Sequence, residues 1–150
     1  MHESCLEKQN KIKELFKACS SDEAKYQKLM EMGRNQPPLP PEDRIPDNLV
    51  RGCQSQLYLS SKLEGDHVVF CAESDALISA GLAALLVNVY SGETPETILK
   101  CPPTYLDELG INASLSPNRA NGLYSLHLRM KQDALKLMIQ KTEDNKGKRL

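Results

Sequence analysis

Apolar residues recur at helical spacing in two stretches near the start of the chain. The first stretch contains Leu6, Ile12, Leu15 and Phe16, and the second contains Tyr26, Leu29 and Met30. This spacing is typical of helices that bury one face. Each stretch begins with a serine followed by a glutamate three residues later, Ser4–Glu7 and Ser20–Glu23, which can form a capping box. Gly33 suits the end of the second helix. We therefore predict an N-terminal helical hairpin.

Five prolines then lie between Gln36 and Asp47. Prolines at this density resist both helix and central strand. We expect an extended segment that crosses the surface of the domain. A linker between two domains is the less favoured interpretation, because the residues before it are too few to bury a core alone.

The middle of the chain alternates between apolar and polar positions, which predicts strands. The alternating apolar residues are Leu57, Leu59 and Leu63, and then Val68, Phe70 and Ala72. Gly65 and Asp66 between these two runs suit a hairpin turn. We expect residues 48–50 to add a further strand before a turn at Gly52. Together these runs predict a small antiparallel three-stranded sheet.

The remaining chain has helical patterns. Ser74 is expected to cap a helix that begins at Asp75, whose carboxylate would face the positive end of the helix dipole. This helix is apolar almost all round and should lie in the core. Thr94–Pro95 predicts the start of a short helix, which Pro102–Pro103 ends, and a turn of helix then ends near Gly110.

Ser116–Pro117 predicts the start of the last helix. Its buried side is expected to contain Leu123, Leu126, Met130, Leu137 and Met138. Residues 143–150 are a charged tail without an apolar pattern. Helices, a small sheet and helices, in this order, predict one α+β domain over residues 1–150, with a core at about 5–140.

Composition narrows the function. The chain has 150 residues, of which 40% are hydrophobic, enough for a real core. Its net charge is −1 and it has no Trp, so a nucleic-acid partner is not expected. The most apolar stretch, residues 76–90, is too short and too polar for a membrane span. Glu3, Glu7 and Glu14 interrupt any leader-like apolar run, so we expect a cytoplasmic protein.

Five cysteines, at positions 5, 19, 53, 71 and 101, include no CxxC pair. Reduced thiols are expected rather than a disulfide framework, and the spacing does not favour a metal site. Cys71 is expected in the core, Cys5 and Cys19 half-buried, and Cys101 exposed. We expect the three histidines to be structural or solvated.

Cys53 is the most informative of these thiols. Gly52 permits a tight turn before it, so the thiol can be presented outward for exchange with an incoming sulfur. Arg51 would lower the pKa of the thiol if its side chain points toward it. A packed, inert cysteine is the alternative.

The run from Asn48 to Tyr58, NLVRGCQSQLY, resembles the signature of the SufE family of sulfur-acceptor proteins. Further segments are similar to the family in the same order, and the resemblance covers about Ile12 to Met138. These segments are Glu42-Asp43-Arg44, Ser74-Asp75-Ala76, Gly81-Leu82, Ser116-Pro117-Asn118-Arg119 and Gly122-Leu123. Tyr58 and Leu57 depart from a frequent Trp and Val in the family. Separated blocks in register are more specific than a lone motif.

The resemblance implies a fold like that of SufE and the related small iron–sulfur scaffold proteins. It also implies that Cys53 accepts persulfide sulfur from a pyridoxal-phosphate cysteine desulfurase, stimulates that enzyme and passes the sulfur to iron–sulfur scaffold proteins. Such a protein is an accessory of the desulfurase rather than a stand-alone enzyme. We expect it to need no cofactor of its own and to be a monomer or weak homodimer. An iron–sulfur scaffold and a desulfurase adaptor that carries no sulfur are the alternatives.

Residues that support the loop or bind a partner are expected to be Gly52, Gln54, Asp75 and Arg119. Arg119 lies in the first turn of the last helix, where the dipole disfavours a cation, so a carboxylate partner such as Asp75 or a docking role would explain it. A solvated Arg119 and a dipole-stabilising Asp75 are the structural alternatives. A persulfide is easily lost, so we further predict that the Cys53 loop packs over an apolar pocket and swings out on binding.

Overall fold

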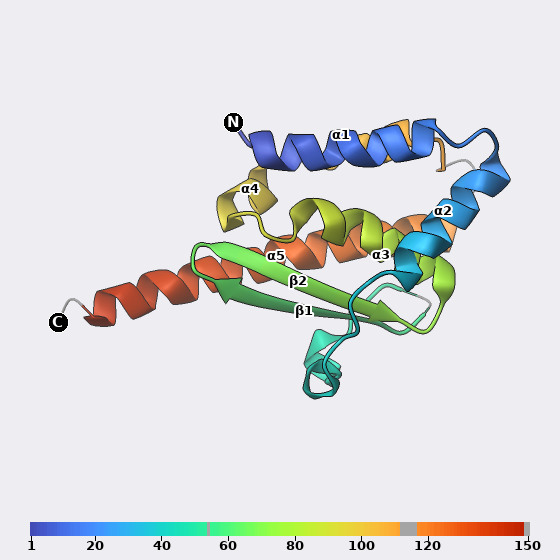
Figure 1. The fold of residues 1–150 in the computed structure, drawn as a ribbon. Coiled ribbons are helices and arrows are strands. Elements are labelled where there is room, and N and C mark those ends of the chain that lie inside the picture. Colours follow the sequence, from blue (N-terminus) through green and yellow to red (C-terminus); the bar gives the residue numbers. More distant parts are fainter. Residues whose placement is uncertain (54, 112–116, 149–150) are drawn as a thin grey trace.

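The computed structural model describes residues 1–53, 55–111 and 117–148 of the chain. Five helices and one β-hairpin surround a common core (Figure 1). The helices are α1 (Glu3–Lys17), α2 (Asp22–Arg34), α3 (Leu77–Tyr90), α4 (Pro95–Lys100) and α5 (Pro117–Lys148). The strands are β1 (Leu57–Glu64) and β2 (His67–Ser74), and the short 3-10 helices are η1 (Pro41–Asp43), η2 (Pro46–Asn48) and η3 (Thr104–Glu108). The predicted α+β class is confirmed.

Helix α3 is the centre of the fold. It packs against α1, α2, α5 and β2, and nine of its residues are buried. Figure 1 shows α3 between α1 and the β-hairpin, with α5 running behind it. Leu85, Leu86 and Val89 are completely enclosed, as expected of a helix that is apolar almost all round.

Glycines bring α2 and α3 into close contact where they cross. A Cβ atom added at Gly81 would lie 2.3 Å from the carbonyl oxygen of Leu29, and one added at Gly33 would lie 2.7 Å from the backbone nitrogen of Gly81. Neither position leaves room for a side chain. Helix α2 continues one residue past Gly33, to Arg34, close to the predicted end.

The predicted caps of the first two helices are wrong. Helix α1 begins at Glu3, and the Ser4 hydroxyl donates to Glu93 at 3.0 Å instead of capping it. The N-cap of α2 is Ser21, whose hydroxyl accepts from the backbone of Ala24, so the cap lies one residue after the predicted Ser20.

Both predicted N-terminal helices are present, but they do not pack together as the expected hairpin, because α1 and α2 each lie against α3 instead. Helix α1 also buries a face shifted from the expected one. Its buried residues are Cys5, Gln9, Ile12 and Phe16, which lie on one side at helical spacing. Leu6 and Leu15 are exposed, contrary to the prediction. Gln9 can occupy a core position because its amide donates to the carbonyl of Pro102 at 3.2 Å. The positions of the apolar residues alone therefore predicted the wrong set of buried residues for this helix.

The sheet has two strands, and the prediction of three is wrong. Strands β1 and β2 pair antiparallel about the predicted Gly65–Asp66 turn, from Leu57 opposite Ser74 to Glu64 opposite His67. The expected third strand is reduced to a bridge between Leu49 and Tyr58. Residues 46–48 form η2, which begins at a proline, and a turn follows at Gly52, so too little extended chain remains for a strand.

The proline-rich segment crosses the surface of the domain, as predicted, but it is not extended throughout, because the 3-10 helices η1 and η2 form within it. The Arg44 guanidinium makes two hydrogen bonds to the Glu73 carboxylate of β2. Asp43 accepts from Ser60 of β1 at 3.3 Å and forms an ion pair with Lys62 at 3.1 Å. These contacts fix the segment that leads to Cys53 on the outside of the hairpin.

Helix α3 begins at Leu77 rather than at Asp75. The Ser74 hydroxyl accepts from the backbone of Ala76 at 3.2 Å, and the N–H of Asp75 still donates to the carbonyl of Gln56 near the end of the strand pair. Asp75 therefore lies before the helix, and its predicted place in the first turn is wrong.

Helix α5 begins at Pro117, as predicted, and continues to Lys148 through most of the charged tail. Leu123, Leu126 and Met130 are buried as expected, Leu137 packs partly against the core, and Met138 is exposed. In the described part of the chain, no helix is both long and apolar enough to cross a bilayer.

Protonation of His127 should destabilise the fold. This α5 side chain is 8% exposed, its ring lies 5.4 Å from that of Tyr90, and its Nε2 atom is buried without a partner among the described residues. Burial, with a smaller contribution from Lys131, lowers its pKa to about 4. The unfolded chain, with a histidine pKa near 6.5, therefore binds the proton more tightly. Stability is complete above about pH 6.5 and falls as the pH drops toward 4.

Urea unfolding at pH 7.5 and pH 5 checks this prediction. The free energy of unfolding should decrease by about 2 kcal/mol through His127 alone. The His127→Phe variant, which keeps a ring against Tyr90, should lose correspondingly less stability over the same interval. An equal loss in both proteins would contradict the assignment.

Candidate functional site

A loop whose ends are tied together carries the Cys53 thiol. The backbone N–H of Val50 donates to the carbonyl of Leu57 at 2.8 Å, and Leu49 and Tyr58 form a bridge just outside this pair. The six residues between Val50 and Leu57 therefore leave the sheet and return to it. We call residues 51–56 the Cys53 loop.

Gly52 gives the loop its turn. Its φ of +90° is in the region that favours glycine. A Cβ atom at this position would also lie 2.6 Å from the hydroxyl oxygen of Ser125 on α5. Backbone conformation and close packing both require glycine here, which agrees with the expectation of a tight turn before the thiol.

Helix α5 provides the surface on which Cys53 rests. The thiol donates to the carbonyl of Gly122, with 3.7 Å between sulfur and oxygen. A Cβ atom added at Gly122 would lie 3.4 Å from the sulfur, closer than most such contacts. The missing side chain at residue 122 therefore makes room for the sulfur atom.

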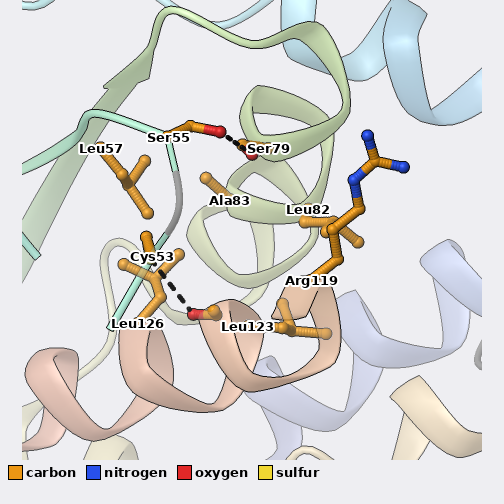
Figure 2. Close-up of a pocket in the computed structure, with 10 residues that line it drawn as sticks. Cys53, Ser55, Leu57, Ser79, Leu82, Ala83, Arg119, Leu123 and Leu126 are labelled. Atoms are coloured by element: carbon orange, nitrogen blue, oxygen red, sulfur yellow. Dashed lines mark hydrogen bonds between the residues drawn. The ribbon is translucent and has the colours of Figure 1, made fainter. Parts of the chain in front are cut away.

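Figure 2 shows Cys53 pointing into a pocket between the loop, α3 and α5. The cavity is about 80 Å³, well above the ~10–15 Å³ that one water molecule needs. Its apolar lining residues are Leu57, Leu82, Ala83, Leu123 and Leu126, and Gly122, Ser55, Ser79 and Arg119 complete it. The loop packs over a pocket as predicted, but polar groups contribute as much of the pocket surface as apolar ones do.

Burial keeps the Cys53 thiol protonated. The side chain is half-buried, and desolvation raises the pKa of the thiol above that of an exposed cysteine. The condition under which Arg51 would lower this pKa is not met, because its exposed side chain lies instead in a groove on α5 with Arg129 and Lys136. In this position of the loop the thiol is a weak nucleophile.

The other predicted site residues are divided between two hollows. Arg119, in the first turns of α5, lines the Cys53 pocket with an exposed side chain. Asp75 lines a separate hollow with Arg44 and Glu73. Because Asp75 precedes α3, its interpretation as a residue of the first helical turn is also wrong. Gln54 lies outside the described residues.

Sequence reasoning missed several residues of the pocket. The hydroxyls of Ser55 and Ser79 lie 3.0 Å apart and link the loop to α3 (Figure 2). Ser125 lies against Gly52. Ser55 belongs to the run from Asn48 to Tyr58, although no role was assigned to it, and Ser79 and Ser125 belong to no motif that the sequence singled out. Only the spacing of Gly122 and Ser125, one turn apart on α5, could have indicated a shared face.

The remaining cysteines lie away from this pocket. Cys5 on α1 and Cys101 at the end of α4 are both buried, with sulfur atoms 3.8 Å and 3.6 Å from the Gln9 amide nitrogen. Burial, followed by the neighbouring Cys101, raises the pKa of Cys5 to about 12. The expectations of a half-buried Cys5 and an exposed Cys101 are therefore wrong. Cys19 is half-buried as expected, whereas Cys71 is half-buried rather than in the core.

Metal-ligating side chains do not gather at this site. Across residues 1–53, 55–111 and 117–148, no three His, Cys, Asp or Glu side chains lie close enough to hold a metal ion. Cys53 is the thiol of its pocket, and Cys71 lies on β2 beside the carbonyl of Pro37 at 3.7 Å.

Comparison with known proteins matches most of the chain to one family. The family model SufE, described as an Fe-S metabolism associated domain, matches residues 10–134. An uncharacterized SufE-like protein of Synechocystis is 34% identical over 129 residues, which cover 86% of this chain and 81% of that protein. SufE-like protein 1, chloroplastic/mitochondrial, of Arabidopsis thaliana is 37% identical over 139 residues, 92% of this chain but 38% of the plant protein.

A solved structure has the same fold. The solution structure of a hypothetical protein from Thermus thermophilus has a TM-score of 0.74 and 28% sequence identity to this chain. The match covers 88% of this chain and 96% of that one.

The pH profile of Cys53 reactivity should be shifted to higher pH relative to that of a free thiol. Because burial raises its pKa, the rate of alkylation by iodoacetamide should reach half its maximum at a pH above that of the same cysteine in the unfolded chain. Rates followed by peptide mass spectrometry from pH 7 to 11, with and without urea, measure this difference. Coincident profiles would contradict burial of the thiol in the folded protein.

Substitution of Gly52 should release the loop. Gly52→Ala places a Cβ against Ser125 at a residue with a positive φ. We expect this to destabilise the observed position of the loop against α5, which we call the retracted position, by about 1–3 kcal/mol. Alkylation of Cys53 should therefore become faster. Gly92→Ala is the matched control, because Gly92 has a φ of +86° but no atom within 4 Å of an added Cβ. The control should lose some stability without faster alkylation of Cys53. Equal alkylation rates in the two variants would contradict the role of the Ser125 contact.

Proposed function

Because this chain belongs to the SufE family, and so has a role in iron–sulfur metabolism, we propose that it receives sulfur from a cysteine desulfurase and carries it as a persulfide on Cys53. The desulfurase would supply the carbon–sulfur cleavage through its own cofactor. This chain would supply a thiol, a place to keep the transferred sulfur, and a loop that brings the two together.

The transfer is an exchange between two sulfur centres. The Cys53 thiolate attacks the terminal sulfur of the desulfurase persulfide, a new S–S bond forms on Cys53, and the S–S bond on the desulfurase breaks. The electron pair of the broken bond leaves with the desulfurase thiolate, which takes up the proton that Cys53 lost. No external oxidant or reductant is needed, and the step requires no acid–base pair on the acceptor.

The observation that carries the proposal is the pocket beneath the Cys53 sulfur. It is lined by Leu57, Leu82 and Leu126 and has room beyond the thiol. A persulfide is lost to reductants or oxidants when it is exposed, so a pocket next to the thiol that shields it with apolar side chains favours its survival. A cysteine that was merely packed would fill its cavity instead of opening onto one.

Sulfur transfer would require the loop to leave this position. In the retracted loop the raised pKa of Cys53 suppresses the thiolate, and the sulfur faces α5 rather than solvent. In a partner's active site, loss of this desolvation would restore the thiolate. Arg51 and Gly52 are already exposed, and Arg119 lies at the edge of the pocket, so these residues are the parts of the site that a desulfurase can reach first.

The arrangement of the cysteines favours a carrier over an iron–sulfur scaffold. A scaffold needs three or four ligands that converge on one site. Cys53 shares its pocket with serines and apolar side chains, while Cys5 and Cys101 are buried away from this pocket. We therefore propose that the sulfur is passed on to a separate scaffold protein.

Incubation with cysteine and a cysteine desulfurase tests this function. The wild-type chain should gain the mass of one sulfur atom, located on the Cys53 peptide and removable by dithiothreitol. Cys53→Ser should gain none, whereas the matched control Cys71→Ser, which alters another half-buried thiol, should be loaded normally. Sulfur loading of the Cys53→Ser chain to the wild-type level would contradict the proposal.

The same experiment distinguishes a sulfur carrier from a desulfurase adaptor that carries no sulfur. A carrier that removes sulfur from the desulfurase should accelerate its turnover only when Cys53 is present. If Cys53→Ser stimulates the desulfurase as strongly as the wild-type chain does, the protein acts as an adaptor.

A further inference from the structure

One side of α5 contacts both the Cys53 loop and the residues that lead into it. Gly122, Ser125, Arg129 and Asp133 are separated by three, four and four residues, which places them along a single face of the helix. Gly122 and Ser125 contact the loop itself. Arg129 and Asp133 lie further along, beside the chain that enters the loop.

Arg129 binds the backbone that leads to Cys53. Its Nη1 donates to the carbonyl of Leu49 at 3.1 Å, and its Nη2 donates to the carbonyl of Asp47. Leu49 is the last residue before Val50, where the Cys53 loop is closed by the bond to Leu57. We call residues 47–50 the stem. One guanidinium therefore connects two stem carbonyls to α5.

Asp133 fixes the guanidinium in place. Its carboxylate accepts from Arg129 Nε at 3.0 Å and from the hydroxyl of Ser61 on β1 at 2.7 Å. The side chains of Arg129 and Asp133 are only 24% and 17% exposed, so solvent competes weakly for these bonds. The planar fork of arginine suits this use, because it donates in fixed directions to several acceptors at once.

The stem is thus held from two sides. On the β1 side, Val50 and Leu49 pair with the strand. On the α5 side, Arg129 supplies the hydrogen bonds to the carbonyls. The same helix accepts the Cys53 thiol at Gly122, so the position of the stem on α5 determines whether the sulfur meets that carbonyl.

We propose that Arg129 is a positioning residue that holds the Cys53 loop in its retracted position. The inference rests on the proposed function only for its purpose, because the retracted loop is observed in the structure. Arg129 does not contact the sulfur. It acts through the stem, and its loss lets the loop spend more time away from α5, with the thiol exposed before any partner is bound.

The alkylation rate of Cys53 relative to that of Cys71 in the same chain tests this inference. Cys71 is a half-buried thiol on β2 and reports general loosening of the fold. Arg129→Gln, which removes a charged donor from two carbonyls, should raise the ratio about tenfold or more. Arg129→Lys keeps the charge but cannot span both carbonyls, so it should restore part of the wild-type ratio. Asp133→Asn leaves the arginine present but weakens its anchor, and should raise the ratio less than Arg129→Gln does.

Lys141→Gln is the matched control. Lys141 is also a cation of α5 that donates to a carbonyl of the hairpin, that of Gly65 at 3.2 Å, but at the turn rather than at the stem. It should leave the ratio unchanged. The inference is overturned if Arg129→Gln leaves the ratio at its wild-type value, or raises the rates of Cys53 and Cys71 by the same factor. If Arg129→Gln does not fold, the ratio of the Cys53 and Cys71 alkylation rates is measured in Asp133→Asn instead, and an unchanged ratio there overturns the inference. Because alkylation needs no desulfurase and no sulfur donor, the result is independent of whether Cys53 carries sulfur.

Discussion

Burial of most of α3 is the constraint on which the other elements depend. A helix with apolar residues almost all round must be covered on every side, and here α1, α2, α5 and β2 provide that cover. The cover is tightest at Gly33 and Gly81, where the backbones of α2 and α3 touch. With α3 fixed in this way, Leu82 and Ala83 stand behind the Cys53 loop and form the fixed wall of its pocket.

Under the proposed function, the site combines this wall with a loop that leaves it during sulfur transfer. The wall is made by α3 and α5, which belong to the core. Among the described residues, the loop is attached through its stem and through contacts at Gly52, Cys53, Ser55 and Gln56. A sulfur carrier has to satisfy two opposed requirements, because the cargo must be protected during transport and accessible during exchange. If this chain has the proposed function, a small loop over a preformed pocket would meet both requirements without a rearrangement of the core.

The sequence was sufficient for features that depend on neighbouring residues. The turn at Gly52, the hairpin at Gly65–Asp66 and the start of α5 at Pro117 follow from local conformational preferences, and the structure has all three. Features that depend on distant contacts were missed or misplaced. Arg129 belongs to no local motif, because its partners, the carbonyls of residues 47 and 49, lie about eighty positions earlier. The buried face of α1 was likewise decided by Pro102, which accepts from Gln9.

The hydrogen bond between Val50 and Leu57 also limits how far the Cys53 thiol can move from the body of the protein. Cys53 is three residues from Val50, and a fully extended chain spans about 3.5 Å per residue, so its backbone can travel at most about 10 Å from that anchor. While the hydrogen bond between Val50 and Leu57 is kept, the loop is therefore too short to reach into a deep, narrow channel. Under the proposed function, a donor would therefore have to hold its sulfur close to its own surface. Otherwise its active site would have to accommodate the surface of this protein around the Cys53 loop as well as the loop itself.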